Sequence, residues 1–107
     1  MSLKKLGQVL RLVDLVGYND ESVVSKTIID RKSGSVSLFA FVEGQGLNEH
    51  TAPYDTIIFL LNGEAEVVIS SNVLGLKEGE LVIIPANQLH SLKALKRFKM
   101  LLIMIKS

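Results

Sequence analysis

The chain consists mainly of short runs rich in β-branched and aromatic residues, separated by turn residues about every ten positions. The runs that we expect to form strands are residues 22–30, 35–43, 56–61, 64–70, 73–76, 80–85, 88–92 and 98–105. Many short strands with turn signals at this spacing are typical of a β-sandwich or β-barrel. The pattern therefore predicts an all-β fold.

The turn residues between these runs suggest how the strands connect. Residues 31–34, with the sequence RKSG, join the first two runs, so we expect these to form a hairpin. Asn62-Gly63 separates two further runs and is the strongest short hairpin signal, so a second hairpin is expected there. Near the N-terminus we expect a strand at residues 8–12 and a short helical turn at residues 13–16.

The alternation within the runs predicts which side chains face the interior. In residues 35–43 both faces are partly apolar, as in a strand between two covered surfaces. If Phe59 and Leu61 face outward, Thr56, Ile58 and Leu60 line the interior. Further side chains expected to line the interior are Phe39, Phe41, Met100, Leu102 and Met104. The methionines are interpreted mainly as core residues because methionine fills irregular gaps.

Length and composition restrict the possible functions. The 107 residues, of which 48% are hydrophobic, suit one domain spanning residues 1–107. The absence of cysteine excludes disulfides, thiolate metal sites and a cysteine nucleophile. A net charge of +1 indicates no nucleic-acid partner. No secretory signal is apparent and the longest apolar run, residues 100–105, is too short to span a bilayer, so we expect a cytoplasmic protein without a membrane partner.

Two histidines, His50 and His90, are the side chains best suited to chemistry, and both lie in segments that resemble the two motifs of the cupin family. The first family motif is Gly, five residues, His, one residue, His, three or four residues, Glu, six residues, Gly. Residues 44–63, GQGLNEHTAPYDTIIFLLNG, match it at Gly44, His50 and Gly63. The second motif is Gly, five residues, Pro, one residue, Gly, two residues, His, three residues, Asn. Residues 79–94, GELVIIPANQLHSLKA, match it at Gly79, Pro85 and His90.

The resemblance implies a double-stranded β-helix, the jelly-roll barrel of the RmlC-like cupins, with a ligand or metal site inside. It also implies a metal site of three histidines and one glutamate, of which only His50 and His90 remain. Ala52 and Thr56 replace the other two ligands, and Ala94 replaces the final Asn. Asn87 stands at the motif glycine, a mild change because Asn also tolerates positive φ.

A third metal ligand is therefore needed for a tight site. Asp55 is the first candidate, because two histidines and one carboxylate suit Fe(II), Mn(II) and similar ions, with Ni and Zn also considered. Strand alternation turns Asp55 away from the face that His50, Ala52 and Thr56 share, but a bulge at Pro53 could turn it inward. An equally good interpretation is that Asp55 is a turn residue. Glu49 is the next candidate.

Three functions remain open. The first is a cupin that binds a metal ion or a small molecule in the barrel, with Thr56, Phe39, Phe41, Ile58 and Met100 lining the pocket. The second is a metal-dependent oxygenase or isomerase that uses His50, His90 and Asp55. The third is a structural domain whose histidines are remnants. No catalytic residue is assigned. Barrels of this family look dimeric, so a homodimer is expected, with residues 22–30 and 98–105 at the interface.

Overall fold

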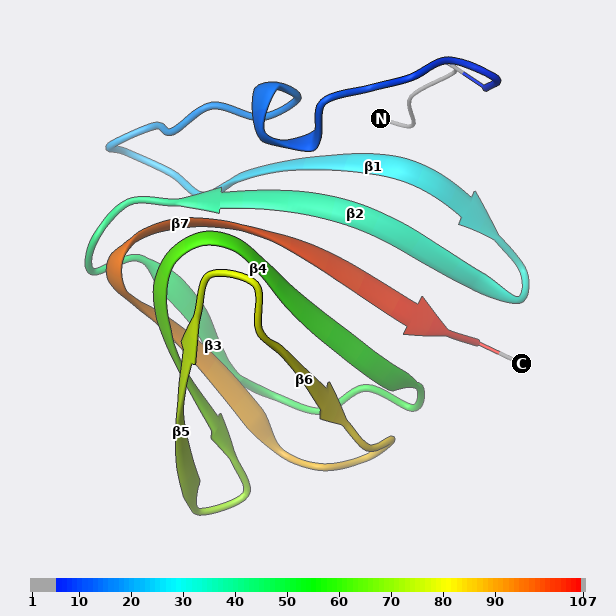
Figure 1. Ribbon diagram of the computed structural model, residues 1–107. Helices are drawn as coiled ribbons and strands as arrows, with labels where there is room; N and C mark the ends of the chain where they lie inside the picture. The colour runs from blue at the N-terminus through cyan, green and yellow to red at the C-terminus, as the bar shows by residue number, and fades with distance from the viewer. Residues whose placement is uncertain (1–5, 107) are drawn as a thin grey trace.

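The computed structural model describes residues 6–106 and is built almost entirely of antiparallel strands (Figure 1). The elements are the 3-10 helix η1 (Leu12–Asp14) and the strands β1 (Val24–Arg31), β2 (Gly34–Phe41), β3 (Gly46–His50), β4 (Asp55–Ile69), β5 (Asn72–Lys77), β6 (Leu81–Ile84) and β7 (His90–Ile105). The strand order is β1-β2-β7-β4-β5, with β3 paired to β7 and β6 paired to β4. The predicted all-β fold is confirmed.

Two long strands, β4 and β7, run through both layers of the molecule. The first half of β4 and the second half of β7 pair with each other and with β6 and β2. The other halves pair with each other and with β5 and β3. The two layers enclose one apolar core. Its buried members come from both layers and are Phe41, Ile58, Leu60, Ala65, Val67, Leu76, Ile84, Leu92, Ala94, Phe98 and Met100.

The predicted hairpin at Asn62-Gly63 is wrong, because these residues lie in the interior of β4 where the strand bends from one layer to the other. The pairing with β7 shifts register between Leu60 and Ala65, which marks a bulged segment. Gly63 has φ +79°, and a Cβ there would lie 2.0 Å from the Arg97 carbonyl oxygen. The Asn62 side chain accepts the Lys99 N–H at 2.7 Å. The Asn-Gly pair thus builds a corner within one strand rather than a turn between two.

Other local expectations have mixed outcomes. The hairpin around residues 31–34 is confirmed as the β1–β2 connection. The expected runs 88–92 and 98–105 are joined in a single strand, β7, which begins at His90. The expected strand at residues 8–12 is wrong: Gln8 to Arg11 form no strand, and the helical turn begins at Leu12.

The N-terminal segment covers part of the outer face of the sheet (Figure 1). Val16 is buried against Leu38 and Ala40, which project from β2 away from the main core. The Lys99 ammonium donates to the Val13 carbonyl, and the Asn62 amide donates to the Tyr18 hydroxyl at 3.2 Å. In residues 6–106, no helix is long and apolar enough to cross a membrane.

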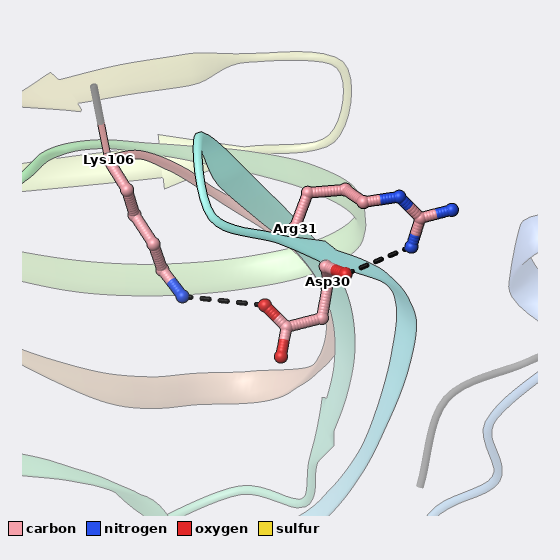
Figure 2. Close-up of polar contacts among 3 residues, drawn as sticks. All are labelled: Asp30, Arg31 and Lys106. Atoms are coloured by element: carbon pink, nitrogen blue, oxygen red, sulfur yellow. Dashed lines mark hydrogen bonds and ion pairs between the residues drawn. The ribbon is translucent and has the colours of Figure 1, made fainter.

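The end of β7 is held beside the β1–β2 hairpin by residues around Asp30 (Figure 2). The Lys106 ammonium lies 3.4 Å from the Asp30 carboxylate, and the Lys106 N–H donates to the Ser33 carbonyl at 2.8 Å. The Arg31 guanidinium donates to the Asp30 carbonyl at 3.0 Å. Asp30 is largely exposed, so solvent screening limits the ion pair to less than ~1 kcal/mol. These contacts secure the register of β7 at its C-terminal end.

Candidate metal centre

His50 and His90, forty positions apart in the sequence, lie directly opposite each other on β3 and β7. Their ring centres are 4.2 Å apart and the rings are tilted by 59°. His90 is 7% exposed and alternates along β7 with the buried Leu92 and Ala94, so it faces the inside of the molecule. Opposite residues of an antiparallel pair project to the same face of the sheet, so His50 lies on the face of His90, but it is exposed to solvent.

A bulge in β3 brings His50 to this face. Leu47 pairs with Leu92 and His50 pairs with His90, so three steps along β3 correspond to two steps along β7. In a regular strand, residues three apart project to opposite faces. The extra residue in β3 therefore allows both Leu47 and His50 to face inward.

Two loops that adjoin the histidines are hydrogen-bonded to each other. Residues 51–54 follow His50 and residues 85–89 precede His90. The Asn87 N–H donates to the Ala52 carbonyl at 2.7 Å, and the Ala86 N–H donates to Asp55 Oδ1 at 2.9 Å. Asn87 has φ +68°, which confirms that asparagine takes the left-handed conformation at the motif glycine. We call these two loops together the rim.

The hydrogen bonds of the imidazoles determine their tautomer. His50 Nδ1 lies 2.7 Å from the Asn48 carbonyl oxygen, and His90 Nδ1 lies 2.9 Å from the Gln88 carbonyl oxygen. Because a carbonyl can only accept, Nδ1 carries the hydrogen in both rings, and in the neutral imidazole Nε2 keeps a free lone pair. Donation from the second nitrogen to a carbonyl is the usual arrangement of a metal-ligating histidine.

The side chains expected to line the interior do face inward. Thr56, Ile58, Phe41 and Met100 are buried, and Phe39 packs against the same core. Phe41 stacks on Phe98 with a centroid distance of 4.6 Å. Contact of these side chains with a ligand stays a prediction.

Thr56 lies at the same end of the molecule as the histidines. It is the second residue of β4, directly after loop 51–54. Its partner Ile84 is the last residue of β6, directly before loop 85–89. Thr56 is 3% exposed, and its hydroxyl donates one long hydrogen bond, 3.4 Å, to the Tyr54 carbonyl.

Asp55 does not lie with the two histidines. The expected metal site of two histidines and one carboxylate is therefore wrong in its third ligand. It precedes Thr56 on β4 and takes the outer face, its carboxylate accepting from Ala86 and lining a cavity of about 240 Å³ with Tyr54 and Lys106. Pro53 interrupts the ladder as expected, but no bulge turns Asp55 inward. The interpretation of Asp55 as a residue of the turn is the one that its geometry supports.

Glu49, the second candidate ligand, also stays outside the set. It lines a groove of about 400 Å³ together with Lys93 and Ser91, and neither histidine lines that groove. Within residues 6–106, no three His, Cys, Asp or Glu side chains come together as a metal site.

The sequence reasoning missed the two carbonyls that orient the imidazoles and the bonds that join the rim loops. All are main-chain groups, which every residue carries, so no side-chain pattern marks them.

The donor pair fits a single metal ion as far as two ligands can. Nitrogen ligands lie ~2.1 Å from an ion such as Zn²⁺, so the centres of two coordinating imidazoles are ~4.6 Å apart at a 90° ligand angle and ~5.3 Å apart at the tetrahedral angle. The observed separation of 4.2 Å is shorter than both values, so the rings would move slightly apart to share one ion. The unprotonated Nε2 atoms supply the right chemistry, and a complete shell requires further donors from outside the protein.

Comparisons with known proteins agree with the motifs. The family model of the cupin domain matches residues 37–106, so the chain belongs to the cupin family. No curated protein matches the chain significantly.

Solved structures with the same fold are numerous. A conserved protein of unknown function from Streptococcus pyogenes is 30% identical, with a TM-score of 0.89 over 94% of this chain and 89% of its own. A cupin superfamily protein from Desulfitobacterium hafniense is 27% identical, with a TM-score of 0.88 over 94% and 93% of the two chains. A cupin 2 conserved barrel domain protein from Leptotrichia buccalis is 31% identical, with a TM-score of 0.87 over 91% of this chain and 47% of its own. The jelly-roll barrel of the cupins is therefore the fold of this protein.

Proposed function

We propose that this cupin binds a divalent metal ion through Nε2 of His50 and His90, with a small molecule completing the coordination shell from the barrel interior. The observation that carries the proposal is the pair of adjacent imidazoles on one face of the sheet. Their ring centres are 4.2 Å apart, and in each ring the Nδ1–H donates to a main-chain carbonyl. A metal ion between the rings would use the lone pairs of both Nε2 atoms at once.

The residues have distinct roles in this proposal. His90, nearly buried, would be the fixed ligand, and His50, at the more exposed rim, would be the ligand nearer solvent. A bound ion supplies Lewis acidity and orients a coordinated molecule. Thr56 and the apolar side chains below would limit which molecules fit.

Binding is favoured over catalysis as the proposed function. An oxygenase or isomerase with two histidines and one carboxylate would need a carboxylate in the set, and Asp55 is committed to the Ala86 N–H on the outer face of β4. The binding proposal requires only the two imidazoles that are together.

The decisive experiment measures Co²⁺ binding by isothermal titration calorimetry on protein purified without chelator. His50→Ala and His90→Ala should each weaken binding at least ~100-fold, because loss of a direct ligand costs more than loss of an outer partner. Asp55→Asn is the matched control and should bind Co²⁺ as tightly as the unaltered protein. Absence of Co²⁺ binding to the unaltered protein would leave the remnant-histidine interpretation. Weaker binding in Asp55→Asn alone would return the carboxylate to the ligand set.

We also propose that the protein forms a homodimer, and we place the interface on β6 and β4, where Ile57 adjoins Ile103 of the expected segment 98–105, rather than on the expected residues 22–30. Within residues 6–106, the apolar cluster around Val16 takes in Leu38 and Ala40 of β2, Leu61 of β4 and Leu101 of β7, but no residue of β6. Leu81 and Ile83 on β6 are 54% and 59% exposed. They pair with Phe59 and Ile57 on β4, which extends the apolar surface across adjacent strands. A flat apolar sheet face is complementary to a second copy of itself, as an isologous interface requires.

A further inference from the structure

A small cavity lies on the outer side of the molecule, between the rim and the end of β7. Its volume is about 240 Å³. Its lining residues are Pro53, Tyr54, Asp55, Ala86, Ile105 and Lys106. Asp55 and Ile105 pair across β4 and β7, in the row that follows Ile57 and Ile103 on the same face. Neither histidine lines the cavity, so it is separate from the proposed metal site, and it lies at the end of the proposed dimer interface.

Two opposite charges line this cavity without forming an ion pair with each other. The Lys106 ammonium extends toward the Asp30 carboxylate, 3.4 Å away (Figure 2). Asp55 Oδ1 accepts the Ala86 N–H at 2.9 Å, and the ion pairs among residues 6–106 do not include Asp55. A carboxylate has two acceptor oxygens and an ammonium has three hydrogens. Asp55 and Lys106 therefore both keep the capacity to bind a further charged group.

The charges around the cavity balance. Asp55 and Lys106 line it, Asp30 holds Lys106, and Arg31 donates to the Asp30 carbonyl (Figure 2). Two carboxylates and two cations sum to zero, so these surroundings favour neither a net anion such as phosphate nor a simple organic cation. A molecule that carries both charges is better matched, because each of its charges meets an opposite one.

The size and the remaining lining restrict the ligand further. At ~30 Å³ for each water molecule of the liquid, the cavity has room for about eight non-hydrogen atoms. Pro53 and Ile105 give part of the lining an apolar character, and Ile105 is 45% exposed, so a ligand that covers it removes apolar surface from water. The Tyr54 ring lies 5.8 Å from the Lys106 ammonium, a cation–π contact that helps to keep the ammonium at the cavity.

From these observations we propose that the cavity binds a small zwitterion, an α-amino acid with a short apolar side chain. The α-ammonium donates to the second oxygen of Asp55, the α-carboxylate accepts from Lys106, and the apolar side chain packs on Ile105. The Ala86 N–H, which holds the first oxygen of Asp55, keeps that carboxylate oriented. The proposal does not depend on metal binding by the two histidines.

The test is a titration of ¹⁵N-labelled protein with L-valine, followed by the amide signals in NMR spectra. Valine carries both charges on a short apolar molecule whose size matches the cavity. The signals of Ala86 and Lys106 should shift and saturate, whereas the signal of Gly75, on β5 away from the cavity, should not move. Absence of a saturable shift at Ala86 and Lys106 would overturn the proposal.

Two analogues of valine separate its two charges. Isovalerate lacks the ammonium group and isobutylamine lacks the carboxylate. Each should bind at least about tenfold more weakly than valine, because each loses one hydrogen bond between charged groups. Binding of either analogue as tight as that of valine would mean a site for a simple anion or a simple amine and would overturn the zwitterion class.

Two variants assign the charges to their residues. Asp55→Asn removes the negative charge but keeps an acceptor for the Ala86 N–H, and Lys106→Met removes the ammonium but keeps most of the apolar stem. Each should weaken valine binding at least about tenfold. Lys93→Met is the matched control, since Lys93 lines the separate groove beside Glu49, and it should bind valine as tightly as the unaltered protein.

The outcomes distinguish this site from the proposed metal site. Loss of valine binding in Asp55→Asn, with Co²⁺ binding retained, supports two independent sites. Unchanged valine affinity in both Asp55→Asn and Lys106→Met would overturn the proposal and leave the metal site untouched. An equal loss in Lys93→Met and Lys106→Met would show general charge attraction only and would also overturn it. The dispersion of the amide signals in each variant's spectrum shows that the variant is folded.

Discussion

The roles of single residues at the rim depend on the main-chain groups to which their side chains are hydrogen-bonded. The motif predicted that His50 and His90 come together, and the structure pairs them, while their role as ligands stays a prediction. It could not reveal that both Nδ1 atoms bind carbonyls, nor that Asp55 meets the Ala86 N–H. The alternation of strand residues already opposed an inward Asp55, and the observed geometry follows that simple rule.

Asp55 is therefore expected to stabilise the rim rather than bind metal. Asp55→Ala removes the acceptor of the Ala86 N–H and should lower the free energy of unfolding by ~1 kcal/mol, the usual net worth of an accessible hydrogen bond. Urea unfolding followed by circular dichroism measures this change. Asp55→Asn keeps an acceptor oxygen and should recover most of the loss. A stability of Asp55→Ala equal to that of the unaltered protein would show that the contact contributes nothing in solution.

Among the elements, the sequence pattern predicted most strands, but it did not predict that two pairs of runs join into the long strands β4 and β7. The runs on either side of Asn62-Gly63 have the right alternation, with Ala65 and Val67 buried as their positions indicate. The local signal favoured a turn because Asn-Gly is common in hairpins. The structure instead pairs β4 with β7 along almost its whole length, from Asp55 to Ile69. This long-range pairing determines the path of the chain, and no short window of sequence contains it.

Gly63 provides the test of this corner. Gly63→Ala places a Cβ 2.0 Å from the Arg97 carbonyl at a positive φ, so either the bulge or β7 must move. We expect a loss of at least ~2 kcal/mol in the free energy of unfolding, since strained left-handed conformations cost of this order. Gly75→Ala is the control, because it lies in β5 with no atom within 4 Å of the added Cβ, and it should change stability by less than ~0.5 kcal/mol. Similar thermal midpoints for the two variants would contradict the corner as described.

At the scale of the whole molecule, the sheet has two apolar surfaces, of which one forms the core and the other is only partly covered. The inner surface forms the core and was predictable from alternation, since Thr56, Ile58 and Leu60 face inward together. The N-terminal segment covers part of the outer surface, and no periodic sequence pattern predicted its position. For the remaining outer surface, the sequence indicated strands with two apolar faces, and such strands need cover on both sides.

The uncovered outer face leads to the last prediction, that the protein is a homodimer at micromolar concentration. Ile83 projects from β6 at 59% exposure beside Leu81, in the middle of the apolar rows. Ile83→Glu would bury a charge in the interface of each copy, and the two-fold symmetry doubles that cost, so it should shift the protein to monomers. Leu95→Glu is the control, because Leu95 is 43% exposed on the other half of β7, away from β6. Sedimentation equilibrium should give twice the chain mass of 11.8 kDa for the unaltered protein and for Leu95→Glu, and the chain mass for Ile83→Glu. A monomeric unaltered protein would mean that this face is covered by something other than a second copy, and a dimer that survives Ile83→Glu would place the interface elsewhere.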